Sequence, residues 1–165
     1  MNLSQPLIAE LEHEAFITRR VLERVPFERF DFKPHPKSMS AGRLASHVAE
    51  LFGRGRMTLE TEEFLMDPAK YSPWTAGSTS ELLAKLDGGV ADFKAALGKA
   101  GASDLMAPWR FRTPEKVIFE LPRIAVLRSM VFSHLIHHRG QLSVFLRLLE
   151  VPVPSIYGPS ADERS

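Results

Sequence analysis

Two histidines in the last third of the chain have the spacing of a metal chelate. His134 and His138 are four residues apart, so on a helix their imidazoles lie one above the other on the same face. At 100° per residue, both fall in the middle of an apolar stripe that also contains Leu127 and Phe145. Two imidazoles on adjacent turns, about 6 Å apart at the backbone, can share one divalent ion. The pair therefore indicates one half of a metal site.

A third ligand has to come from the buried face of another helix, and His47 meets this condition. It follows Leu44 by three residues and precedes Leu51 by four, inside the apolar stripe of its own segment. His13 lies off the stripe of its segment, and His35 lies between two prolines in a connection. His47 is therefore the predicted third ligand.

Burial of three imidazoles without partners would cost several kcal/mol, and a metal ion would supply a partner to all of them. A buried histidine is more often a hydrogen-bonded core residue than a ligand, and a pair at this spacing is by itself a weak signal. From the pattern alone, a metal site formed by His47, His134 and His138 and a polar core cluster both stay open.

Three neutral imidazoles would leave a divalent ion with open coordination positions, whereas closed zinc sites normally have four protein ligands. We find no carboxylate on the buried faces near the three histidines, so the charge of the ion favours an anionic further ligand. A thiol ionises more readily than water, because its pKa starts near about 8.5 rather than about 15.7. The chain has no cysteine, so a thiolate would come from a substrate or cofactor. Thiol transfer and hydrolysis by a metal-activated water both fit.

Residues close to the histidine pair have secondary roles in this interpretation. Gln141 lies near one turn beyond His138 and is predicted either to hydrogen-bond a ligand or bound water, or to cap a polar end of the bundle. His137 falls on the rim of the stripe, where it would act as an acid or base or make a rim hydrogen bond. Arg139 and Arg128 are predicted to face outward, at the surface or in a dimer interface.

Four amphipathic segments are predicted to position these side chains. Apolar residues recur at three- and four-residue steps. Either Ser38 or Ser40 could cap the start of the second segment, and Ser78 is suited to cap the third. Together they indicate an all-α fold, a four-helix bundle with long connections. The predicted helices cover residues 4–25, 40–66, 79–98 and 121–150.

The connections are long enough to cross an end of the bundle, as residues 26–39 could, or to pass along its side, as residues 98–121 could. Residues 102–120 fit either a short hairpin or an irregular loop over one end of the core. Trp74 and Trp109 lie in long connections, where they would either roof an open site or form a satellite of the core.

Composition limits the class of protein. The chain has 165 residues, of which 44% are hydrophobic and 25% charged, and we expect one globular domain over residues 1–165. A net charge of +1 gives no electrostatic reason to bind nucleic acid or an anionic membrane. No apolar run is long enough to span a bilayer, and acids at Glu10, Glu12 and Glu14 interrupt any signal peptide. We therefore expect a cytoplasmic protein.

Two sequence motifs resemble those of a known family. The first is His134-Leu-Ile-His137-His138-Arg-Gly-Gln141, followed after Pro152 by Tyr157-Gly-Pro-Ser-Ala-Asp-Glu163. The second is Pro34-His-Pro-Lys-Ser-Met-Ser40-Ala-Gly-Arg-Leu-Ala-Ser-His47. Both are similar to the DinB-like (damage-inducible) family, and the combination is more specific than either motif. Many relatives have asparagine before the first histidine of the last helix, where this chain has Ser133.

The resemblance implies a four-helix bundle that binds one divalent ion per chain, usually nickel or zinc, through His47, His134 and His138. It also implies a homodimer. Better characterised relatives are metal-dependent enzymes that use low-molecular-weight thiols on small-molecule substrates, among them bacillithiol transferases and the mycothiol-dependent maleylpyruvate isomerase. We therefore expect a thiol transferase-like enzyme. The alternative is a non-catalytic stress or binding protein in which the ion joins two helices.

Overall fold

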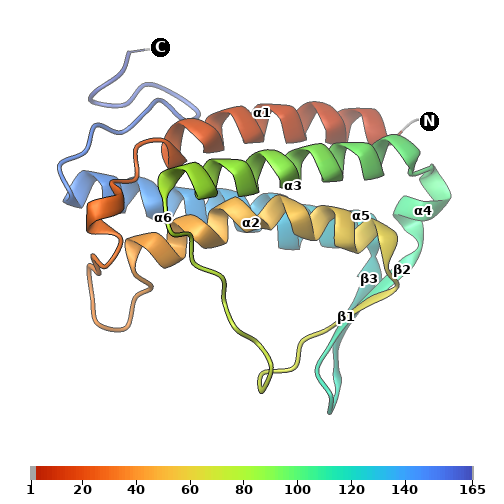
Figure 1. Cartoon of the computed structure of the whole chain (residues 1–165). Helices are drawn as coiled ribbons and strands as arrows, with labels where there is room; N and C mark the ends of the chain where they lie inside the picture. Colours follow the sequence, from red (N-terminus) through yellow and green to blue (C-terminus); the bar gives the residue numbers. More distant parts are fainter. Residues whose placement is uncertain (1–2, 165) are drawn as a thin grey trace.

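Four long helices form the body of the protein in the computed structural model, which describes residues 3–164. They pack side by side around one apolar core (Figure 1). The fourth continues two shorter segments, α5 (Arg123–Val126) and the π-helical η2 (Leu127–Ser133). The long helices are α1 (Ser4–Leu22), α2 (Ala41–Glu60), α3 (Thr79–Lys99) and α6 (His134–Leu148).

The order of the helices differs from a simple up-and-down bundle. Helix α3 packs between α1 and α2, and α6 contacts the same two helices from the other side. Residues 23–40, which include the short helix η1 (Phe27–Arg29), cross one end from α1 to α2 (Figure 1). Residues 61–78 then return along the side of the bundle, so that α2 and α3 run in the same direction (Figure 1). The side crossing predicted for residues 98–121 is wrong, since that segment stays at one end.

Serine caps begin the second and third helices, and of the two candidates for the second helix the cap is Ser40 rather than Ser38. The Ser40 hydroxyl accepts a hydrogen bond from the Arg43 amide at 3.2 Å, and the Ser78 hydroxyl accepts one from the Glu81 amide at 3.1 Å. The Glu81 carboxylate accepts from the Gly77 amide at 2.8 Å. Each cap satisfies a backbone donor that the first helical turn leaves without a partner.

A three-stranded sheet lies at one end of the bundle, where the sequence showed little strand signal. Strand β1 (Glu63–Leu65) pairs in parallel with β2 (Pro108–Arg112), and β2 pairs antiparallel with β3 (Val117–Pro122). The short helix α4 (Ala102–Met106) precedes β2. Of the two alternatives for residues 102–120, the hairpin is correct.

Because of the sheet, two helix boundaries differ from the predicted ones. The second helix ends at Glu60 rather than near residue 66, because Thr61 turns extended and leads into β1. The hydroxyl of Thr61 accepts a hydrogen bond from the Trp109 indole at 3.1 Å, which ties this helix end to β2. The last helical stretch begins at Arg123 rather than residue 121, because Leu121 and Pro122 belong to β3.

Arg139 is buried, so the prediction that it faces outward is wrong. Its side chain is 1% exposed and pairs with the Glu14 carboxylate of α1 at 2.6 Å. It also donates to the Thr18 hydroxyl at 3.0 Å and to the Tyr157 hydroxyl at 2.5 Å. Helix α6 therefore buries two faces, one against α2 and one against α1 and the C-terminal tail.

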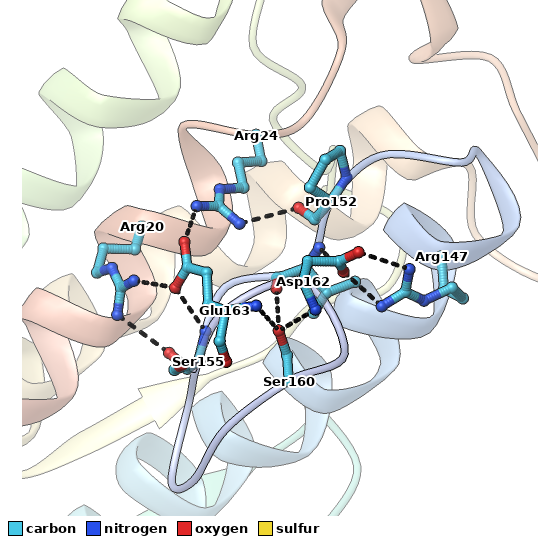
Figure 2. A network of polar contacts seen from close by, with 9 residues as sticks. Arg20, Arg24, Arg147, Pro152, Ser155, Ser160, Asp162 and Glu163 are labelled. Carbon is cyan, nitrogen blue, oxygen red and sulfur yellow. Dashed lines mark hydrogen bonds and ion pairs between the residues drawn. The ribbon is translucent and has the colours of Figure 1, made fainter. Parts of the chain in front are cut away.

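The C-terminal tail is fastened to α1 and α6 by charged groups (Figure 2). The Glu163 carboxylate pairs with both Arg20 and Arg24 of α1 and accepts from the Ser155 amide at 3.0 Å. The Asp162 carboxylate pairs with Arg147 of α6 at 2.6 Å. These contacts give the acidic residues of the Tyr157–Glu163 motif a structural role.

No helix within residues 3–164 combines the length and apolarity that a membrane crossing requires.

Candidate metal centre and its cavity

The side chains of His47, His134 and His138 converge from two helices. The Nε2 atoms of His47 and His134 are 3.2 Å apart, and one nitrogen from each of the three rings lies within 4.8 Å of the others. A tetrahedral ion with bonds of about 2.1 Å separates its nitrogen ligands by about 3.4 Å. The three imidazoles therefore fit one divalent ion once the more distant ligand nitrogens, which lie up to 4.8 Å apart, move closer by about 1.4 Å or less.

Two of the rings are held in the orientation that a metal ligand needs. Glu50 lies 3.0 Å from Nδ1 of His47, and the Gln141 Oε1 lies 2.8 Å from Nδ1 of His138. A carboxylate and an amide oxygen only accept hydrogen bonds, so Nδ1 is the donor in both contacts. The Nε2 atoms are left to face the centre of the cluster, and such partners tune both ring orientation and basicity.

Glu50 corrects the prediction that no carboxylate lies near the three histidines. Burial would raise the pKa of Glu50, but hydrogen bonds from His47 and Arg43 outweigh this effect and the pKa is lowered. The carboxylate is therefore ionised at neutral pH and offsets part of the charge of an ion bound nearby. Its position three residues after His47 on the same helix is the sequence signal that could have identified it.

The histidines of α6 are held in the neutral form that binds metals. Burial lowers the pKa of His134 to about 4, with further lowering from the nearby His138, His47 and Arg54, and only the Met130 carbonyl opposes this. Burial also lowers the pKa of His138. The buried Nδ1 of His134 makes no hydrogen bond of ordinary geometry. Both rings can therefore offer a lone pair at neutral pH without first losing a proton.

A cavity of about 670 Å³ adjoins the cluster, and His47 forms part of its wall. Helix α2 supplies one side, and the sheet, α5, η2 and the returning loop supply the others. Trp74 and Trp109 both line it. Its further wall residues are mostly apolar, with Lys85 from α3 at the edge: Glu50, Gly53, Arg54, Met57, Thr58, Phe64, Met66, Tyr71, Ser72, Pro73, Phe111, Val126, Met130 and Val131.

The remaining histidines lie apart from the ligand atoms. His137 is exposed, and its ring packs against that of His138 at 4.8 Å between centroids, away from the cavity wall. His13 and His35 are exposed. Gln141 is also exposed, so its hydrogen bond holds His138 from the outer side.

Phe64, Phe111 and Arg54 also belong to this region, and none of the three was predicted from the sequence. Arg54 follows Glu50 by four residues and therefore shares its face of α2, a spacing that is visible in the sequence. Phe64 and Phe111 meet only through the pairing of β1 with β2, which leaves no local signal.

Comparisons with known proteins agree with the observed fold. A family model described as the DinB family matches residues 1–164. The Bacillus subtilis protein YrdA is 26% identical over 156 residues, which cover 92% of this chain and 86% of YrdA. A solved DinB-like protein from Bacillus cereus has a TM-score of 0.68 and 20% identity, and the match covers 90% of this chain and 94% of the Bacillus cereus chain. The DinB-like YjoA from Bacillus subtilis has a TM-score of 0.67 and 18% identity, and the match covers 88% of this chain and 92% of YjoA. At these identities the two structures show the fold alone.

Proposed function

Because the chain belongs to the DinB family, and because its three-histidine cluster adjoins a cavity, we propose that it is a metal-dependent enzyme that transfers a low-molecular-weight thiol to a small electrophile. The observation that carries the proposal is the cavity of about 670 Å³ against His47. A purely structural ion would have its remaining positions packed by protein, whereas this cluster has room for two small reactants beside it.

In this proposal, His47, His134 and His138 hold one divalent ion, nickel or zinc. When bound, the ion lowers the pKa of a thiol in its free coordination position, so that the thiolate is available at neutral pH. Glu50 and Gln141 keep the rings of His47 and His138 turned toward the centre. The mostly apolar walls of the cavity would hold the electrophile beside His47.

Substitution of cobalt for the native ion tests the proposal. A small thiol such as 2-mercaptoethanol should produce a sulfur-to-metal charge-transfer band, and its affinity should rise with pH toward the pKa of the thiol, since the thiolate is the ligand. The His138→Ala variant should give no band. A panel of electrophiles then tests for turnover.

The alternative is a protein in which the ion only joins α2 to α6. His47 lies on one of these helices and His134 and His138 on the other, so a bound ion would link them whatever its chemistry. This alternative predicts no thiol band at any pH. It also predicts a loss of stability on metal removal, about 4 kcal/mol at a thousandfold excess of ion over its dissociation constant.

We further propose that the protein acts in the cytoplasm, where small thiols are kept reduced, and that it forms a C₂ homodimer. Exposed apolar side chains support the dimer: Phe16 on α1 is 64% exposed, and Val144 and Leu148 lie one turn apart on α6. Sedimentation equilibrium should give twice the chain mass of 18.5 kDa at micromolar concentration. A mass of one chain would contradict the dimer.

A further inference from the structure

We propose that the cavity beside His47 binds a substrate with an aromatic body and one carboxylate, and that the carboxylate pairs with Arg54. That the bound molecule reacts rests on the proposed function. Its binding does not, and can be measured separately.

The walls of the cavity are suited to a flat apolar molecule. Phe64 and Phe111 stack with centroids 5.8 Å apart and planes 16° from parallel, which gives the sheet side an ordered aromatic surface. Trp74 lies on the returning loop and Trp109 on β2, and both also face the cavity. Aromatic side chains prefer offset-stacked or edge-to-face contacts with other rings. A volume of about 670 Å³ lies within the range that accepts a drug-sized molecule.

Arg54 is a charged group in this wall whose guanidinium is paired only at long range. Its guanidinium is 3.7 Å from the Glu50 carboxylate, which is longer than a hydrogen bond. That carboxylate already accepts hydrogen bonds from His47 and Arg43. Within residues 3–164, the Arg54 guanidinium makes no hydrogen bond. Its donors are therefore available to a carboxylate, which a guanidinium binds through two parallel hydrogen bonds.

The charges around the cavity favour an anion over a cation. Lys85 lies at the edge with its Nζ 5.6 Å from the centre of the Trp74 ring, and no carboxylate of the described residues lies within 4 Å of it. Arg54 and Lys85 together carry two positive charges, against the single negative charge of Glu50. An ion on the histidines would add to this excess, so an amine would be repelled and a carboxylate attracted.

Gly53 offers a way to fill the cavity without touching the histidines. It lines the wall on α2, and a Cβ atom added there would meet nothing within 4 Å. Gly88 on α3 is equally open but does not line the cavity, so it provides a matched control. Gly53→Phe therefore tests the volume, and Arg54→Gln tests the charge.

The experiment uses the metal-loaded full chain and titration calorimetry with 2-naphthoate and its neutral isostere 2-naphthamide. Both tryptophans of the chain line the cavity, so quenching of their fluorescence gives a second readout. We expect naphthoate to bind about tenfold more tightly than the amide, because it gains a bidentate ion pair. Arg54→Gln should remove this preference and leave amide binding unchanged. Gly53→Phe should weaken both ligands at least tenfold, and Gly88→Phe should weaken neither.

Repeating the titrations after metal removal separates Arg54 from the ion as the carboxylate's partner. The preference for naphthoate, and its loss in Arg54→Gln, should persist in the metal-free protein. Equal binding of acid and amide would overturn the proposal. So would naphthoate binding that requires the metal and is indifferent to Arg54→Gln, since the carboxylate would then lie on the ion. Failure of the proposed function has a different signature: the cobalt protein gives no thiol band while naphthoate binding still depends on Arg54.

Discussion

Glu50 accepts a hydrogen bond from Nδ1 of His47 at 3.0 Å, and Nε2 of the same ring lies 3.2 Å from Nε2 of His134. The carboxylate therefore fixes which nitrogen of His47 faces the other two histidines. Glu50→Gln should weaken metal affinity by about 10- to 100-fold, because a neutral amide holds the ring less firmly and makes it less basic. Competition with a chelator of known affinity measures the change. Glu60→Gln alters an exposed acid on the same helix and is the control; equal affinities in both variants would contradict the role of Glu50.

The metal content of the purified protein tests the ligand set directly. We expect about one divalent ion per chain when no chelator is used, with nitrogen ligands at about 2.0 to 2.2 Å by X-ray absorption. His47→Ala, His134→Ala and His138→Ala should each abolish tight binding. His137→Ala should retain the ion, since that ring is exposed beside the cluster. Full metal occupancy in the His138→Ala variant would show that His138 is not a ligand.

The buried pair of Arg139 and Glu14 should matter far more for stability than the exposed pairs. Glu14→Gln leaves a guanidinium that is 1% exposed without a counter-charge, and we expect a loss of about 3 to 5 kcal/mol. Glu12→Gln removes an exposed pair with Lys94 and should cost less than about 1 kcal/mol. Denaturant unfolding measures both. Similar losses for the two variants would mean that solvent reaches the Arg139 pair.

Gly55 of α2 lies tightly against the Phe93 side chain of α3. A Cβ atom added there would lie 2.6 Å from the ring of Phe93, which is fully buried and has no room to retreat. Gly55→Ala should therefore destabilise the protein by about 1 to 3 kcal/mol, although alanine favours a helix. Gly88→Ala meets open space and should stabilise it by about 0.5 to 1 kcal/mol. Thermal unfolding of the two variants should shift in opposite directions.

Acid should release the C-terminal tail before the bundle unfolds. The hydrogen bond from the Ser155 amide and the pairing with Arg24 and Arg20 lower the pKa of Glu163 to about 2, and the bond from Arg147 lowers the pKa of Asp162. A carboxyl whose folded pKa lies below its unfolded value of about 4.3 stabilises the folded state above that pH. The contribution is therefore present at neutral pH and is lost as pH falls from about 4.3 to about 2.

Hydrogen exchange at the amides of Val153 and Ser155 measures this release, since these groups donate to Asp162 and Glu163. Their protection, corrected for intrinsic rates, should decline across this pH range. In Glu163→Gln the protection of Ser155 should be low at neutral pH and change little with acid. Protection of Ser155 that is unchanged down to pH 2 would show that the carboxylate does not hold the tail.

The predictable part of the fold was the part encoded by local signals. The apolar spacing of the helices and the caps at Ser40 and Ser78 depend on neighbours a few residues away, and both caps are confirmed. Strand β1 has no such signal. It is three residues long, follows a helix directly, and exists only because Phe64 and its neighbours pair with a distant segment. The helix before it was therefore predicted to run about six residues too far.

The candidate site shows the same division between local and distant information. Helical spacing on α2 and α6 was enough to select His47, His134 and His138, which the structure brings together. Arg139 was misplaced because a helical wheel with one apolar stripe assumes one buried face, whereas α6 also packs against α1. The π-helical stretch Leu127–Ser133 departs from 100° per residue, and nothing in the sequence marks it.

The parallel pairing of β1 with β2 has a consequence for the order of folding. The whole of α3 lies between the two strands along the chain, so their hydrogen bonds close a long loop, which costs entropy until the helices have packed. We therefore expect the helices to assemble early and the aromatic wall of Phe64 and Phe111 to form late. The same pairing would be among the first to open in the native state. A molecule bound between this wall and α2 would slow that opening. The cavity would therefore be most rigid when a ligand occupies it.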